Sequence, residues 1–244
     1  MTAMPAAGWV ARLNIPEASR AAWERQLQPP FEPYIERIGR GDAATWVLRS
    51  ELFNYASDAE EVRGRALPLI DQLNGAQRIF QEMQPVQFHG VGHVEADGTL
   101  SITLFAETHF NANGMFVAVV EQRDAQGNLI VSSPQASETQ RWVQAAQAND
   151  NIADLLSYLA SSDNWYDVYK ALEVIEAMAG HPRQHNLKQL LGRDARAYEV
   201  ARESANFYRH ARKKRPNDLI SLKEARSTLM HVVRTVVAQF LRSQ

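Results

Sequence analysis

The sequence predicts an α+β protein with two domains. A mixed or antiparallel sheet with one or two helices is expected over residues 1–134, and an all-α helical bundle over residues 135–244. Before Pro134, short apolar runs alternate with turn residues, as in strands. After Pro134, the apolar residues recur with helical spacing. The charge changes too, because residues 1–135 hold 10 Lys/Arg against 16 Asp/Glu, whereas residues 183–244 hold 14 against 5.

The N-terminal elements follow from short apolar runs that end at turn signals. Asp97-Gly98 and Ala125-Gln126-Gly127 are the turn sequences of two hairpins. A helix should begin near Asp58, because Ser57 and Glu60 have capping-box spacing, and Pro68 should kink or divide it. The expected strands cover residues 8–15, 44–53, 86–94, 100–110, 115–122 and 128–132.

The C-terminal elements are helices with polar residues or breakers between them. Ser221 and Glu224 form a second capping box, which should open a core helix with an apolar stripe from Leu222 to Phe240. The expected helices cover residues 136–148, 151–161, 164–179, 184–191, 195–212 and 221–242.

Composition excludes several classes of protein. The 244 residues contain no cysteine, so disulfides, thiolate metal sites and cysteine nucleophiles are excluded, and a cytoplasmic location is expected. There is no apolar run of transmembrane length and no secretory signal pattern, so no membrane association is expected. The common phosphate-loop, dinucleotide, zinc-protease and hydrolase motifs are missing as well.

The histidines do not predict a metal site. His89 and His93 share one face of a strand, and His109 lies on the next strand. A two- or four-residue hairpin loop would turn His109 to the opposite face, whereas a three-residue loop would restore it to the same face. We therefore expect neither a metal nor a cofactor.

The strongest charge feature is a basic run at the end of a predicted helix. It comprises Arg209, His210, Arg212, Lys213, Lys214 and Arg215, and Phe207 and Tyr208 precede it. Part of this charge needs no ligand, because cations are favoured at a helix C-terminus. The alternative is anion binding, in which the cations bind phosphate and an aromatic ring stacks on a base.

The helix that ends in this run also has a polar face, made by Arg202, Asn206, Arg209, His210 and Lys213. Its other face, with Ala197, Ala201, Ala205 and Tyr208, should pack inward. On the 164–179 helix, Tyr169, Lys170, Glu173 and Glu176 lie beside the apolar stripe. If the two helices are neighbours, Glu173 could pair with Arg209 or orient His210. Such a network is either structural or functional, and the spacing does not decide between them.

Three segments of the C-terminal half resemble a family of uncharacterised bacterial proteins with a helical C-terminal domain. They are Trp165 with Tyr169-Lys170-Ala171-Leu172-Glu173, Ala205-Asn206 with Arg209-His210, and Ser221-Leu222 with Glu224-Ala225. Val168 replaces the family's usual Leu, and the spacer between the Asn and the Arg-His pair is shorter here. The resemblance implies no activity, but it marks Tyr169, Lys170, Glu173, Asn206, Arg209 and His210 as positions to test.

A basic helical bundle also resembles HEPN-type domains, whose metal-independent ribonucleases use an Arg-x4-6-His motif. Arg226 and His231 have this spacing. Residues five apart on a helix diverge by about 140°, however, and the pair falls inside the predicted core helix. The resemblance implies Arg226 and His231 as catalytic residues, with His210 and Glu173 as the other candidates.

These observations lead to three hypotheses. In the first, the C-terminal domain binds RNA or a nucleotide through residues 209–215 and the polar face of the preceding helix, as part of a defence or toxin-type system. The N-terminal domain would then sense a signal or form a homo-oligomer. In the second, the bundle is a non-enzymatic interaction module that presents Trp142, Trp165 and Tyr166. In the third, the protein is a metal-independent ribonuclease.

Overall fold

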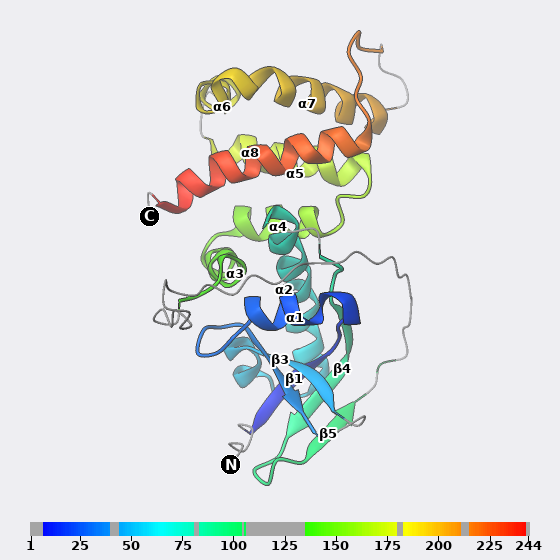
Figure 1. The fold of residues 1–244 in the computed structure, drawn as a ribbon, viewed down its shortest axis with the longest axis vertical. Helices are drawn as coiled ribbons and strands as arrows, with labels where there is room; N and C mark the ends of the chain where they lie inside the picture. The colour runs from blue at the N-terminus through cyan, green and yellow to red at the C-terminus, as the bar shows by residue number, and fades with distance from the viewer. Residues whose placement is uncertain are drawn as a thin grey trace, which may run out of the picture. The chain divides into compact units, whose positions relative to one another are not determined.

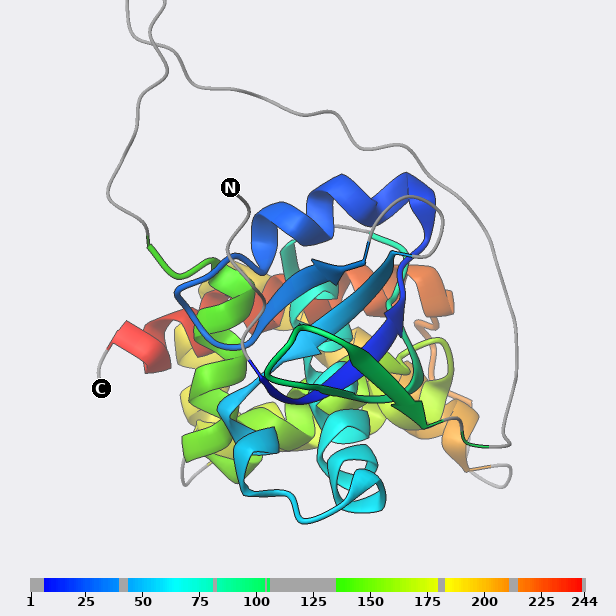
Figure 2. The ribbon, with the colours of Figure 1, turned by 90° about the horizontal axis from the view of Figure 1, so that it is seen from below.

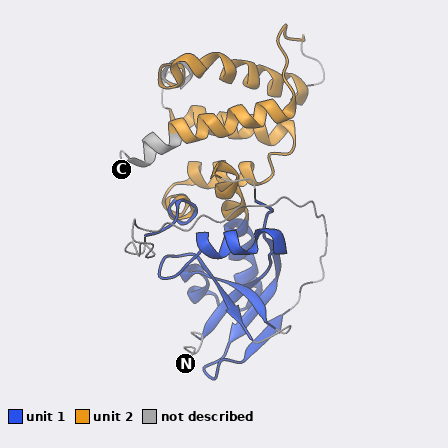
Figure 3. Cartoon of the chain, in the orientation of Figure 1, with its two compact units in different colours: residues 1–70, 83–141 blue, residues 71–82, 142–244 orange. Residues whose placement is uncertain are grey.

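The structure is a computed structural model that describes residues 7–39, 44–80, 83–103, 105, 135–179, 183–210 and 215–242. The chain forms two compact units (Figure 3), residues 1–70 with 83–141 and residues 71–82 with 142–244. The first unit contains an antiparallel sheet and the second is helical, so the α+β class is confirmed. The expected boundary at residue 134 lies a few residues before the change of unit at 141. Residues 71–82 join the second unit from within the first half of the chain.

The first unit is built on a five-stranded sheet with the order β2-β3-β1-β4-β5, in which neighbouring strands are antiparallel (Figures 1 and 2). One helix connects β1 to β2 and another connects β3 to β4. This β-α-β-β-α-β order is the split βαβ, or ferredoxin-like, topology. The elements are β1 (Gly8–Asn14), α1 (Glu17–Gln26), β2 (Tyr34–Ile38), β3 (Thr45–Arg49), α2 (Ala59–Phe80), β4 (Gln87–Val94) and β5 (Leu100–Thr103).

Two elements of this unit were not predicted, and one was predicted wrongly. Helix α1 and strand β2 are short, and few apolar residues of α1 are buried, chiefly Trp23. The indole N–H of Trp23 donates to the carbonyl of Gln84 at 3.0 Å. The predicted strand 44–53 stops at Arg49. Ser50 then caps the 3-10 helix η2 (Glu51–Tyr55) by accepting a hydrogen bond from the Leu52 N–H, so a capping serine diverts the chain out of the sheet.

The start of α2 is displaced by one residue from the prediction. Asp58 caps the helix, because its side chain accepts the Glu61 N–H at 2.9 Å. The Glu61 carboxylate in turn accepts the Ser57 N–H at 2.8 Å. The helix then runs to Phe80 without interruption, with Pro68 inside it, so the two shorter pieces considered from the sequence do not form.

The hairpin at Asp97-Gly98 is confirmed. The Asp97 side chain accepts the Thr99 N–H at 2.8 Å, and Gly98 has φ of 83°, the left-handed region that favours glycine. Val94 pairs with Leu100, so residues 95–99 join the strands. A loop with an odd number of residues gives the same face relation as the three-residue alternative, so the two- and four-residue loops are wrong. His109 and the predicted hairpin at 115–132 lie outside the described residues.

The second unit packs the end of α2 with helices from the C-terminal half. Helix α7 lies over α5 and α8 (Figure 1), and the helices are close to those predicted, except that α7 ends at Arg209 and not at residue 212. The helices are α3 (Glu138–Ala148), α4 (Asp150–Ala160), α5 (Trp165–Met178), α6 (Arg183–Leu191), α7 (Ala195–Arg209) and α8 (Leu222–Arg242), with the short 3-10 helix η3 (Gly192–Asp194) before α7.

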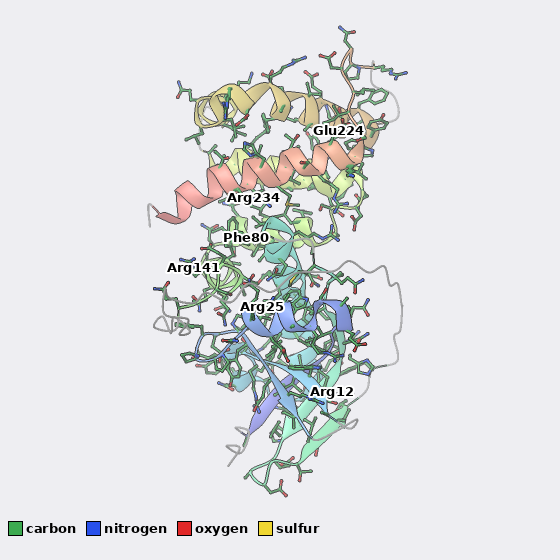
Figure 4. The ribbon with its side chains drawn as sticks, in the orientation of Figure 1. Arg12, Arg25, Phe80, Arg141, Glu224 and Arg234 are labelled. Atoms are coloured by element: carbon green, nitrogen blue, oxygen red, sulfur yellow. The ribbon has the colours of Figure 1, made fainter. Side chains whose placement is uncertain are left out.

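Helix α8 begins as predicted. The Glu224 N–H donates to the Ser221 hydroxyl at 3.2 Å, and the Ser221 N–H donates to the Glu224 carboxylate at 2.8 Å, which completes the capping box. Further along α8, the Arg234 guanidinium donates to the Ile79 carbonyl at the end of α2. Figure 4 labels Glu224 and Arg234. The apolar stripe of α8 is buried, as predicted, at Ala225, Leu229, Val232, Val233 and Val236.

Within the second unit, the end of α2 approaches α4 at Gly75. A Cβ atom built on Gly75 would lie 1.9 Å from the carbonyl oxygen of Leu156, which is a backbone atom and cannot turn away. A Cβ built on Gly64, earlier in the same helix, meets nothing within 4 Å. Glycine at position 75 therefore permits close contact between the two helices.

We predict that Gly75→Ala lowers the free energy of unfolding by about 1–3 kcal/mol, because the two helices must separate. The matched change Gly64→Ala should instead stabilise the protein by about 0.5–1 kcal/mol, because alanine favours the helix. Urea denaturation followed by circular dichroism measures both. Equal effects of the two substitutions would contradict the close packing at Gly75.

Candidate functional site

The residues marked by the sequence gather along α5 and α7. Asn164 caps helix α5, because its side chain accepts the Asp167 N–H at 3.0 Å. Helix α7 packs against α5 and against α8. The face of α7 turned inward differs from the prediction, because Ala197 and Tyr208 are exposed. The buried residues are Tyr198, Ala201, Ser204 and Ala205.

The deepest polar contact between α5 and α7 is formed by Glu176. Its carboxylate accepts the hydroxyl of Tyr198 and the Nε–H of Arg202, and Arg202 Nη2 lies 3.4 Å from its second oxygen. Burial raises the pKa of Tyr198, and the hydrogen bond to Glu176 raises it further. Burial alone would lower the pKa of Arg202, but the contact with Glu176 outweighs it and the pKa is raised. The charge of Arg202, one of the predicted ligand-binding residues, is therefore already balanced.

A second cluster lies one turn earlier on α5. Lys170 Nζ is 2.8 Å from the Glu173 carboxylate, and the Tyr169 hydroxyl also donates to Glu173. Burial would raise the pKa of Glu173, but the hydrogen bonds from Lys170 and Tyr169 outweigh it, so the pKa is lowered. Burial raises the pKa of Tyr169. Lys170 and Glu173 therefore form a compensated pair within one helix.

Arg209 packs on an aromatic ring near the Glu173 carboxylate, whose pKa its charge lowers. Its Cζ lies 3.9 Å from the centre of the Tyr169 ring, which is a cation–π contact. Its Nη2 also lies 2.9 Å from Nε2 of His210, the residue that ends α7 in an extended conformation. Arg209 thus contacts Tyr169 and His210, and its charge also lowers the pKa of Glu173. The suggested contact of Glu173 with His210 stays a prediction. Asn206 is half-buried beside them.

Two aromatic rings stack next to this cation. Trp165 at the start of α5 and Tyr208 near the end of α7 have ring centres 4.6 Å apart and planes 15° apart. Tyr208 is 49% exposed, and Phe207 also contacts it, with ring centres 5.2 Å apart and planes 73° apart. The predicted inward orientation of Tyr208 is wrong, because the large buried ring on α7 is Tyr198. Trp142 is buried and cannot be presented to a partner, whereas Tyr166 is exposed.

The basic run is described only at its two ends. Arg212, Lys213 and Lys214 lie outside the described residues. Arg215 is exposed and lines a hollow of about 470 Å³ together with Arg196, Glu203, Pro216, Asn217 and Asp218. Within the described part of the chain, no carboxylate forms an ion pair with Arg215.

The two residues with HEPN-like spacing bind different carboxylates. Arg226 Nη1 lies 2.8 Å from Asp163, which also binds Arg78 at 2.9 Å. His231 Nε2 lies 2.9 Å from Asp194 in η3. Each side chain is thus held by a carboxylate from a separate segment, which follows from their divergence on the helix. Among the described residues, no cluster of histidines and acids could hold a metal ion.

Some residues of the site were missed in the sequence. Glu176 was placed beside the stripe of α5 and not within it, and Tyr198 was assigned to neither face of α7. The spacing of Tyr198 and Arg202, four residues apart, puts them on one helical face and was the available signal. No sequence pattern indicated Glu203, Asp218 or Arg196 as site residues, because the hollow depends on how the 215–218 segment lies against α7.

No family model, curated protein or solved structure matches this chain. In the part of the chain that the structure describes, no helix combines the length and the apolar character needed to cross a membrane.

We predict that Glu176→Gln lowers the free energy of unfolding by about 1.5–3 kcal/mol, because Arg202 and Tyr198 lose a charged acceptor in a buried place. Glu199→Gln, which removes a partly exposed carboxylate paired with Lys188 and Arg196, is the matched control and should have a smaller effect. Urea denaturation at pH 7 compares the two. A destabilisation by Glu199→Gln as large as that by Glu176→Gln would refute the anchoring role of Glu176.

Proposed function

We propose that the helical unit binds RNA or a nucleotide through the C-terminal end of α7 and the basic run that follows it. The observation that supports this best is the stack of Tyr208 on Trp165 immediately before that run. A half-exposed ring, already held flat by a second ring, is a surface on which an unpaired base can stack without further ordering. The cations at residues 209–215 would bind the adjoining phosphates.

The distribution of paired and unpaired cations supports the same region. Lys170, Arg202 and Arg226 are each bound to a carboxylate and have little charge to offer a ligand. Arg209 contacts an aromatic ring and a histidine instead, and Arg215 has no ion-pair partner among the described residues. At the two described ends of the basic run there are therefore cations that form no direct ion pair with a described carboxylate. A phosphate is the ligand that such charge favours.

Single-stranded nucleic acid suits this arrangement better than a duplex. Stacking on Tyr208 needs a base whose face is free, and bases in a duplex already stack on each other. Arg226 and His231 are bound to separate carboxylates, so the structure gives no support for cleavage by that pair. The proposal is accordingly one of binding.

The test replaces Arg212, Lys213, Lys214 and Arg215 together by alanine. The variant should bind a short single-stranded RNA about tenfold or more weakly than the wild type, and the salt dependence should flatten by about 0.7 for each phosphate that the variant no longer neutralises. Fluorescence anisotropy at several salt concentrations measures both quantities.

The matched control removes the same number of positive charges from exposed positions outside the run, at Arg25, Arg37, Arg141 and Lys223, of which Arg25 and Arg141 are labelled in Figure 4. Its affinity should stay close to that of the wild type. Equal weakening by the two quadruple variants would mean that only net charge matters, and a wild type that binds no RNA would refute the proposal.

A further inference from the structure

The hollow beside α7 has the volume of a small-ligand site, although it is open to solvent and its lining is mainly polar. Its volume of about 470 Å³ falls within the range of pockets that bind small molecules. Arg196 and Glu203 come from α7, whereas residues 215–218 come from the segment that leads to α8. The lining is polar and charged except for Pro216, which points to a polar ligand with charge of its own.

One wall of the hollow is fixed by a chain of ion pairs. Arg196 binds Asp218 across the hollow, and its Nη1 lies 3.7 Å from the Glu199 carboxylate. Glu199 in turn binds Lys188 of α6, and this hydrogen bond lowers the pKa of Glu199. Arg196 and Asp218 therefore balance each other, and they hold the 215–218 segment against α7.

The two remaining charged residues have no such partner. Arg215 and Glu203 are both exposed, and within the described residues neither forms an ion pair, either with each other or with another side chain. The hollow thus offers one cation and one carboxylate that form no ion pair within the part of the chain that the structure describes. Asn217 adds an amide that can both donate and accept, and Pro216 adds an apolar surface.

From this arrangement we infer that the hollow binds a ribonucleotide, either free or as the 3′-terminal residue of an RNA strand. Arg215 binds the phosphate, because guanidinium groups match phosphate oxygens. Glu203 accepts hydrogen bonds from the ribose 2′- and 3′-hydroxyls, the role that carboxylates have in other nucleotide sites. The base lies on Pro216 with its edge toward Asn217. This inference rests on the proposed function and names the part of the ligand that the hollow recognises.

The experiment compares four small probes by isothermal titration calorimetry, namely adenosine 5′-monophosphate, its 2′-deoxy form, adenosine and inorganic phosphate. The wild type should bind adenosine monophosphate about tenfold more tightly than the deoxy form, because the deoxy form cannot donate the 2′-hydroxyl hydrogen bond to a charged acceptor. Glu203→Ala should remove this difference, and it should also weaken the deoxy form, though by a smaller factor, because the deoxy form loses only the hydrogen bond from its 3′-hydroxyl. Arg215→Ala should remove the preference for adenosine monophosphate over adenosine.

Asp154→Ala is the control, because Asp154 is an exposed carboxylate on α4 in the same unit. It should behave as the wild type. A second arm uses two short RNAs that differ only in a 3′-terminal ribose or 2′-deoxyribose. If the ligand is an RNA end, the ribose-ended strand binds more tightly, Glu203→Ala abolishes that preference, and free adenosine monophosphate does not bind.

The inference is overturned if neither the free nucleotides nor the RNA ends show a preference for the 2′-hydroxyl that depends on Glu203. In that case RNA binding that still depends on residues 212–215 would leave the proposed function standing. If the wild type binds none of these probes, both fail together.

Discussion

The arrangement of the candidate site depends on one buried carboxylate. Glu176 on α5 accepts hydrogen bonds from two residues of α7, Tyr198 and Arg202, and so fixes the rotation of α7 about its axis. With Tyr198 turned inward, Tyr208 falls on the outer side of the helix, where it stacks on Trp165. A buried carboxylate is stable only with such partners, so this contact specifies the pairing of the two helices as much as it stabilises it.

The cations of this unit fall into two groups, according to whether or not they form an ion pair with a described carboxylate. Those near the middle of α5 and α7, such as Lys170 and Arg202, are used to balance acids within the fold. Those toward the end of α7 meet an aromatic ring, as Arg209 does, or no described carboxylate, as is true of Arg215. A protein that is close to neutral overall thus has, at the described ends of the basic run, cations that form no direct ion pair with a described carboxylate. Local charge of this kind attracts anions even when the net charge does not.

The sequence predicted the fold class and most helices, because helical spacing and capping boxes such as Ser221 with Glu224 are local signals. The sequence did not predict α1 and β2, which are short. It predicted a strand that continues past Arg49, because nothing in a β-rich run shows that Ser50 caps a 3-10 helix. Of the site, it found the positions on α5 and α7 but not their pairing. Tyr198 is the buried tyrosine of α7, and its hydrogen bond to Glu176 comes from the facing helix, which spacing along α7 does not reveal. The hollow beside Arg215 arises from contacts between distant segments, which spacing along the chain cannot give.

The central claim is that a base stacks on Tyr208 next to the cationic end of α7, and the most direct test is to locate bound RNA on the protein. Single-stranded RNA containing 4-thiouridine is cross-linked to the protein by ultraviolet light, and the attached peptides are identified by mass spectrometry. The account predicts that the main cross-links fall on peptides containing Trp165 or Tyr208, and that Tyr208→Ala removes them. Cross-links found only on other helices or on the sheet unit, and unchanged in Tyr208→Ala, would contradict it.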